Sequence, residues 1–198
     1  MKRALLALSL LTLLAVPAGA VTGGIGVHAG WVAMDDAGND AGWGLLANFG
    51  VSPHVDIQLR MTDFRSLVVD FDDVADLPED IDFRRGFEFQ STLIDFGFAY
   101  NFRKDGRVFT PFVGGGGTYY LLDSTPDSHG RINDEYGWYG LAGLDFIFAK
   151  RWGVYLEGMW RDAKMTIRGD GFGVGTGPTD VGVDLNGPQV NLGIKYTW

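Results

Sequence analysis

Three basic and four acidic residues occupy positions in segments where polar and apolar side chains alternate. They are Arg60, Arg161 and Lys195, and Asp56, Asp95, Asp145 and Glu157. Because alternate residues of a strand point to the same face of a sheet, these charges are expected on one face, where opposite signs can pair. An unpaired charge removed from water is costly. We therefore predict a buried ion-pair network, with the alternative that individual members lie solvated at an open end.

An acidic segment contains carboxylates that could bind divalent cations. Its carboxylates include Asp70, Asp72, Asp73 and Asp76, and the basic pair Arg84-Arg85 follows. Carboxylate oxygens at this density could bind calcium, or share the divalent ions that bridge lipopolysaccharide phosphates. The glycine-turned D-x-D-x-D-G calcium motif is absent, so the four aspartates are weak metal candidates and the expected state is a solvated loop. We expect no cofactor.

Catalytic residues are thinly represented. The chain has no cysteine, which excludes thiol nucleophiles, thiolate zinc sites and disulfides. Ser128 and His129 are adjacent, with Asp127 beside them, and could form a hydrogen bond only if their loop folded suitably. We do not expect an enzyme.

Composition narrows the class further. The 198 residues include 30 glycines, 14% aromatic and 46% hydrophobic residues, with 16 basic against 25 acidic side chains and a net charge of −9. This much glycine argues against a helical bundle, and this much apolar content argues against a disordered acidic tail. Nucleic acid is not an expected partner, because the basic residues are not clustered.

The first 20 residues have the pattern of an export signal. Lys2 and Arg3 precede a leucine-rich run that ends in Ala18-Gly19-Ala20, a small-residue cleavage site. Removal of residues 1–20 would leave 21–198 as one domain. No later stretch reaches the apolar length of a transmembrane helix. An exported chain without cysteine fits a Gram-negative envelope.

The alternation itself predicts strands. At the C-terminal end Val190, Leu192 and Ile194 alternate with Asn191, Gly193 and other polar or small residues. The same pattern predicts eight strands, at about 24–34, 43–51, 55–64, 87–102, 108–121, 137–148, 152–165 and 185–198. Short connections alternate with long ones, which are predicted at 35–42, 65–86, 122–136 and 166–184.

Alternating short and long connections are typical of an outer membrane barrel, with its short turns and termini in the periplasm and its long loops outside. The predicted fold class is therefore all-β, an eight-stranded antiparallel up-and-down transmembrane β-barrel. Aromatic residues near the strand ends fit the girdles of such a barrel. They are Trp31, Trp43, Phe49, Trp138, Phe146, Phe148, Trp152, Trp160, Tyr196 and Trp198. The alternative is a soluble lipocalin-like barrel in the periplasm, whose apolar face would line a ligand cavity.

Three segments resemble a known family. Residues 136–145 with 151–157, and residues 111–119, are similar to the small eight-stranded outer membrane barrels that include outer membrane protein A and the opacity-protein relatives. The aromatic Trp198 at the end of the last strand is similar to that family's assembly signal. The resemblance implies an outer membrane location, contact with lipid and lipopolysaccharide, and the barrel assembly machinery as a partner. The in/out register around Gly114–Gly117 is left open.

A barrel of eight strands has a narrow interior that side chains fill, so an open general pore is not expected. Two functions stay open. One is a structural or surface-interaction role, with acidic external loops and a monomeric barrel. The other is a narrow channel or conduit for small or hydrophobic solutes. The polar, glycine-rich face assigned to the interior favours the first.

Overall fold

The computed structural model describes residues 22–69, 87–102, 108–124, 131–169 and 179–198. These residues include no helix long and apolar enough to cross a membrane. They form ten strands: β1 (Thr22–Met34), β2 (Gly38–Gly50), β3 (Val55–Val69), β4 (Phe87–Asn101), β5 (Phe109–Ser124), β6 (Arg131–Ile132), β7 (Glu135–Ile147), β8 (Trp152–Gly169), β9 (Thr179–Asp184) and β10 (Gly187–Thr197).

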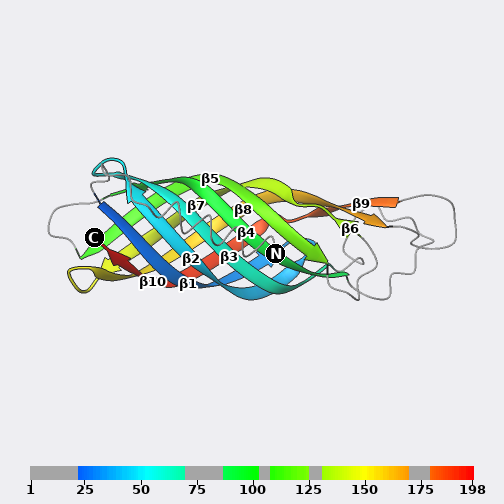
Figure 1. The fold of residues 1–198 in the computed structure, drawn as a ribbon, viewed down its shortest axis with the longest axis horizontal. Helices are drawn as coiled ribbons and strands as arrows, with labels where there is room; N and C mark the ends of the chain where they lie inside the picture. The colour runs from blue at the N-terminus through cyan, green and yellow to red at the C-terminus, as the bar shows by residue number, and fades with distance from the viewer. Residues whose placement is uncertain (1–21, 70–86, 103–107, 125–130, 170–178) are drawn as a thin grey trace.

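The eight long strands close into a barrel (Figure 1). Each pairs antiparallel with its neighbours in the order β1-β2-β3-β4-β5-β7-β8-β10, and β10 pairs back to β1. Closure gives each of these eight strands a partner on both sides, which removes the unpaired N–H and C=O groups of a sheet edge. The eight-stranded antiparallel barrel predicted from the alternation is confirmed.

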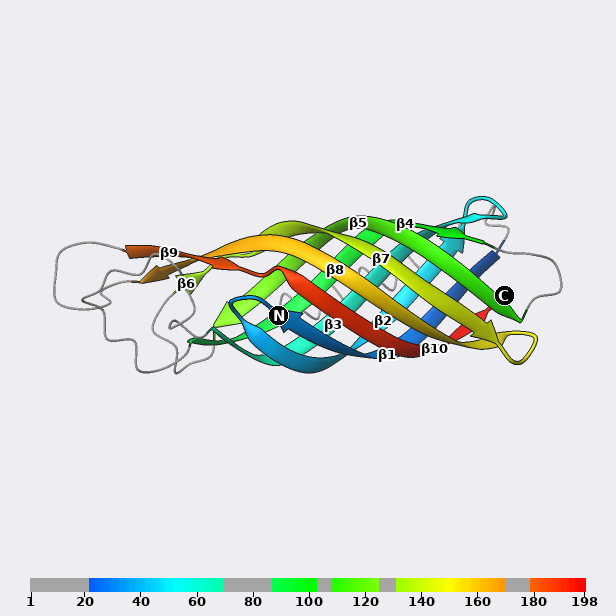
Figure 2. The ribbon, with the colours of Figure 1, turned by 180° about the vertical axis from the view of Figure 1, so that it is seen from behind.

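The barrel has two distinguishable ends, which we name by their connections. At the turn end lie the strand ends that residues 51–54, 102–108 and 148–151 connect, together with the C-terminus, and at the loop end lie the opposite ends of these strands. Figure 2 shows β6 and β9 beside β8 at the loop end, where both pair with the last residues of β8. These two short strands were not predicted.

The prediction of a long loop at 35–42 is wrong. β2 begins at Gly38, so only residues 35–37 separate it from β1, and the alternation of long and short connections fails here. Gly38 has a φ of 64°. Glycine adopts this left-handed conformation at little cost, which permits the tight turn.

β3 also extends farther than predicted, to Val69, by passing through a bulge between Phe64 and Leu67. The Asp40 carboxylate accepts hydrogen bonds from the backbone N–H groups of Arg65 and Ser66, each at 2.8 Å. These are the donors that a bulge removes from the ladder. The extension lengthens the barrel at its loop end.

The register of β5 is settled by its pairing with β4. The two strands are paired residue by residue from Phe89 with Ser124 to Asn101 with Phe112, with no shift at the glycines. Phe112 and Thr118 are buried on the inward face at 4% and 2% exposure. The glycines between them therefore keep the regular alternation.

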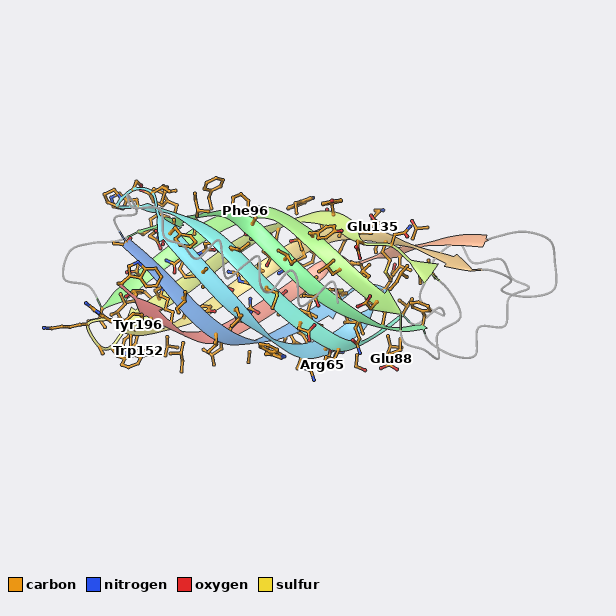
Figure 3. The ribbon with its side chains drawn as sticks, viewed as in Figure 1. Arg65, Glu88, Phe96, Glu135, Trp152 and Tyr196 are labelled. Atoms are coloured by element: carbon orange, nitrogen blue, oxygen red, sulfur yellow. The ribbon has the colours of Figure 1, made fainter. Side chains whose placement is uncertain are left out.

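An apolar band covers the outside of the barrel. Figure 3 shows Phe96, Trp152 and Tyr196 pointing outward from it. Exposed tryptophans toward its loop-end side are Trp31, Trp43, Trp138 and Trp160. At the level of these tryptophans and beyond it, the outward positions include polar residues: Asp63 on β3, Gln90 and Glu88 on β4, and Asp162 and Lys164 on β8. An apolar band edged by aromatics is the surface that a barrel presents to lipid.

Candidate functional site in the barrel lumen

Two arginines and two carboxylates meet in the interior. Arg161 of β8 donates from Nη1 and Nη2 to the two oxygens of Asp95 on β4, at 2.8 and 2.7 Å. Arg60 of β3 donates to Asp95 Oδ2 at 3.4 Å and to Glu157 Oε2 at 2.8 Å. All four side chains are at most 1% exposed. The Arg161–Asp95 pair is bidentate, the strongest geometry for such a pair.

Neutral side chains add hydrogen bonds to both carboxylates and to Arg161, while Arg60 Nε has no partner among the described residues. Thr118 Oγ1 donates to Asp95 at 2.8 Å, and Gln189 Oε1 accepts from Arg161 Nε at 2.6 Å. Asn191 Nδ2 donates to Glu157 Oε1 at 2.7 Å. Each carboxylate oxygen of Asp95 and Glu157 therefore has a donor. We call this set the luminal plug: Arg60, Asp95, Thr118, Glu157, Arg161, Gln189 and Asn191.

The plug closes the barrel at its level. Its side chains come from β3, β4, β5, β8 and β10 and meet across a lumen that eight strands make narrow. None of its members is more than 2% exposed. Opening a path here would separate buried opposite charges, which is strongly unfavourable.

His28 extends the buried polar region toward Tyr155. Its ring nitrogens lie 3.0 Å from Thr62 Oγ1 and 3.0 Å from the Tyr155 hydroxyl. His28 is 4% exposed. Both ring nitrogens have a partner, so the ring is held in one orientation.

The other predicted network residues lie nearer the turn end. Lys195 Nζ pairs with Asp145, and both side chains are 8% exposed. Asp56 accepts a hydrogen bond from Asn48 Nδ2 at 3.3 Å. The structure thus brings Arg60, Asp95, Glu157 and Arg161 into one network and Lys195 and Asp145 into a separate pair.

The remaining candidates are placed as follows. The Trp198 N–H donates to the Gly23 carbonyl at 3.0 Å, and a Cβ at Gly23 would lie 2.7 Å from the indole. Asp70, Asp72, Asp73 and Asp76 lie outside the described residues. Within the described ranges, no group of three or more His, Cys, Asp or Glu side chains could hold a metal.

The loop half of the lumen is filled by apolar side chains that the sequence interpretation missed. We call them the loop-half cluster: Val32, Met34, Ala37, Phe64, Leu67, Val69, Phe87, Phe89, Leu93, Tyr120, Leu122, Ala163, Met165, Ile167, Val183 and Leu185. All are at most 5% exposed. The other half holds buried polar residues together with a smaller apolar cluster, so the interior changes from mixed to apolar just beyond the plug. The smaller cluster consists of Ala99, Phe112, Tyr139, Leu141 and Met159.

A signal for this change is present in β8. Up to Trp160 and Arg161 the outward residues are mainly apolar and the inward ones mainly polar, and from Asp162 and Ala163 onward the two faces exchange character. Such an exchange without a change of period indicates that the strand has left the lipid and entered water. It places the loop-half cluster beyond the apolar band.

Known proteins share this architecture. A family profile described as "Outer membrane protein beta-barrel domain" matches residues 4–197. No curated protein matches the chain. Similar solved structures include the outer membrane protein OprG from Pseudomonas aeruginosa, with 16% identity, 90% of this chain and 96% of that one covered, and a TM-score of 0.73.

Two further structures are similar at lower scores. The outer membrane protein AlkL, determined in lipid bilayers, is 15% identical, with 89% of each chain covered and a TM-score of 0.59. The N-terminal β-barrel domain of Pseudomonas aeruginosa OprF is 13% identical, covering 88% of this chain and 97% of that one, with a TM-score of 0.53. At such identities these likenesses show the fold alone. The family match over nearly the whole length is decisive, and the chain belongs to the outer membrane protein beta-barrel family.

Proposed function

We propose that this outer membrane barrel admits small apolar molecules into its loop half while the luminal plug keeps it closed to ions and water. In this proposal the loop end faces the outside of the cell, and the turn end and both termini face the periplasm. The observation that carries it is the apolar loop-half cluster lying beyond the lipid-facing band. There, an apolar molecule in water finds an apolar interior before it reaches lipid.

The energetics favour such a capture site. Moving apolar surface out of water contributes roughly 25 cal/mol per Å². Met34 and Met165 stand among the cluster residues, and methionine is a flexible side chain that repacks around irregular shapes. The cluster can therefore rearrange around a guest more readily than a core of β-branched residues.

The plug directs where such a molecule goes next. Travel along the barrel axis would require Arg60 and Arg161 to release Asp95 and Glu157, all at most 1% exposed. Breaking a buried pair costs several kcal/mol, roughly 3–5 in measured cases. We therefore propose that the guest passes sideways into the membrane rather than into the periplasm, without any catalytic step.

A structural or surface-interaction role is the second candidate. It is favoured by the packing of the cluster, since its members are at most 5% exposed and fill the loop half as an ordinary core would. In this role a monomeric barrel would meet lipopolysaccharide or other partners through its acidic loops. In both candidate functions the barrel is embedded in outer membrane lipid. In both, the barrel assembly machinery recognises the C-terminal Trp198 during folding.

The uptake of N-phenyl-1-naphthylamine by intact cells of a Gram-negative host tests the proposal. This dye becomes fluorescent when it reaches an apolar phase. Cells with the barrel should take it up faster than cells with an empty vector. Met165→Gln, nearly equal in shape but polar, should slow uptake, whereas Lys164→Gln on the outward face of the same strand should not.

Equal amounts of folded protein are verified by the change in gel migration between heated and unheated samples. Uptake no faster than with the empty vector would contradict the proposal and favour the structural role. Uptake that is faster but equally so in Met165→Gln and Lys164→Gln would place the route outside the loop-half cluster.

A further inference from the structure

Two exposed cations at the turn end stand apart from the other basic side chains of the described residues. The buried arginines pair with carboxylates in the lumen, and the exposed Arg65 and Lys164 at the loop end each lie within 3.4 Å of an aspartate carboxylate. Lys150 and Arg151 are exposed in the turn that joins β7 to β8. Neither pairs with a carboxylate among the described residues.

The Arg151 side chain is held against the outside of the last strand. Its Nη1 donates to Tyr196 Oη at 2.8 Å, and its guanidinium carbon lies 6.0 Å from the centre of the Tyr196 ring. Its backbone carbonyl accepts a hydrogen bond from the Thr197 N–H at 2.8 Å. Tyr196 packs edge-to-face on Trp152, with ring centroids 5.2 Å apart. The guanidinium is therefore positioned beside two aromatic rings.

Most of the hydrogen-bonding capacity of Arg151 is left for a molecule outside the chain. A guanidinium has five N–H donors. Among the described residues, the Arg151 side chain donates to Tyr196 alone. The remaining donors form a planar fork, which binds the oxygens of a phosphate through two parallel hydrogen bonds. Arg151 thus differs from Arg161, whose donors are engaged inside the lumen.

The two aromatic rings set the depth of Arg151 in the membrane. Trp152 and Tyr196 point outward from the barrel at its turn end (Figure 3), and Trp152 is 50% exposed. Tryptophan and tyrosine at the edge of a lipid-facing band lie at the level of the headgroups. A guanidinium bonded to the Tyr196 hydroxyl therefore lies at the height of the headgroup phosphates, which are negatively charged.

We propose that Arg151 binds the headgroup phosphate of a glycerophospholipid in the leaflet that surrounds the turn end. Its free N–H groups donate to the phosphate oxygens, Lys150 adds a second positive charge, and Trp152 and Tyr196 contact the glycerol and the start of the acyl chains. The anion comes from lipid, because the described residues of the turn end include no exposed aspartate or glutamate. The site lies outside the barrel and away from the loop-half cluster, so the inference goes beyond the proposed uptake.

Native mass spectrometry of the barrel in a detergent without phosphate tests the inference. The probe is dioleoylphosphatidylglycerol, and the reference is dioleoylglycerol, which has the same acyl chains and no phosphate. The ratio of the two apparent affinities separates the phosphate contact from the apolar contacts. One lysine or arginine beside an anionic lipid changes the affinity about fivefold. Arg151→Gln should therefore lower the preference for the phospholipid about fivefold.

Arg65→Gln is the matched control. It also removes an exposed arginine, but one at the loop end that pairs with Asp63 at 3.4 Å, and it should leave the preference unchanged. Tyr196→Phe keeps the ring and removes the hydroxyl that positions Arg151. It should lower the preference by less than Arg151→Gln does. The change in gel migration between heated and unheated samples verifies folding, and Tyr196→Phe carries the comparison if Arg151→Gln does not fold.

Each outcome decides for or against the site. A preference that survives in Arg151→Gln overturns the inference. An equal reduction in Arg65→Gln also overturns it, because the effect would then come from positive charge in general and not from the turn end. Weaker binding of both lipids at an unchanged ratio does the same, since it would reflect a disturbed aromatic surface and no lost phosphate contact. A reduction confined to Arg151→Gln and Tyr196→Phe supports the site.

Discussion

The two halves of the lumen are built from the same strands and are equally buried, yet the buried ion pairs lie in one half and the larger apolar cluster lies in the other. In the turn half, Arg161 and Asp95 are at 0% exposure and joined by ion pairs. In the loop half, Leu67 and Phe89 are also at 0% exposure but are packed among apolar side chains. The difference follows from what surrounds each half, which is lipid outside the first and water outside the second.

Lipid provides no hydrophobic driving force for an apolar interior, because the outward face is already in an apolar medium. The polar side chains of a membrane-spanning barrel are therefore inside, where they must satisfy one another. Beyond the band, water restores the usual arrangement with apolar residues inside and polar residues outside. The exchange of faces at Asp162 and Ala163 marks this boundary on β8.

Breaking the plug should have the largest effect on stability. Arg161→Met leaves Asp95 buried with one weaker cationic partner, Arg60 at 3.4 Å. We expect it to lower the free energy of unfolding by roughly 3–5 kcal/mol, measured as the urea midpoint of the gel shift. Arg151→Met is the control, because Arg151 is an exposed arginine at the turn end that bonds Tyr196 at 2.8 Å. Equal midpoints for the two variants would contradict a structural role of the plug.

Truncating the loop-half cluster should be nearly as damaging. Leu67→Ala removes a side chain of 0% exposure and is expected to cost roughly 2–5 kcal/mol, from lost burial and the cavity left behind. Val68→Ala changes the outward neighbour, which is 42% exposed, and should cost far less. The same urea titration compares them. A small effect at Leu67 would mean that the loop half is loosely packed.

Charges on the outer surface should locate the edge of the lipid. Leu192 lies near the middle of β10 and is 57% exposed, so Leu192→Arg would place a charge in the hydrocarbon. We expect a cost of roughly 2–4 kcal/mol for unfolding from a bilayer. Val68→Arg, beyond the band on β3, should cost little. Similar costs at the two positions would show that the lipid reaches farther toward the loop end than the aromatic residues indicate.

The smallest effect is expected for an ion pair in water. Lys164 and Asp184 are 3.2 Å apart, with side chains 76% and 41% exposed. Lys164→Ala should change the free energy of unfolding by roughly 0–1 kcal/mol, because solvent screens such pairs. The urea midpoint at low and high salt measures this. If Lys164→Ala lowered the free energy of unfolding as much as Arg161→Met, exposed and buried ion pairs would not differ in their contribution to stability.

The membrane-spanning part of this fold could be predicted because its signal is local. A period of two assigns Arg60 and Glu157 to the inward face from their neighbours alone. The loop half could not be predicted in the same way. At Ala163 the polarity of the two faces inverts, and the bulge between Phe64 and Leu67 shifts the phase by an extra residue. A search for a constant apolar face therefore ends the strands too early.

Which charged residues pair with one another could not be predicted from the sequence either. Arg161 and Asp95 are 66 residues apart, and Arg60 and Glu157 are 97 residues apart. Which of them meet depends on how the strands are staggered around the closed barrel. Alternation predicts only that they share a face.

The most direct test of the account is thiol labelling, which the chain permits because it contains no cysteine. Single cysteines would replace Met165 in the loop-half cluster and Leu46, a buried inward residue paired with Arg60 in the polar half. In the folded barrel an uncharged maleimide should label Met165→Cys faster than Leu46→Cys, and a sulfonated reagent should label neither. Equally slow labelling of both positions by the uncharged reagent would contradict the proposal that only the loop half of the interior opens to apolar molecules.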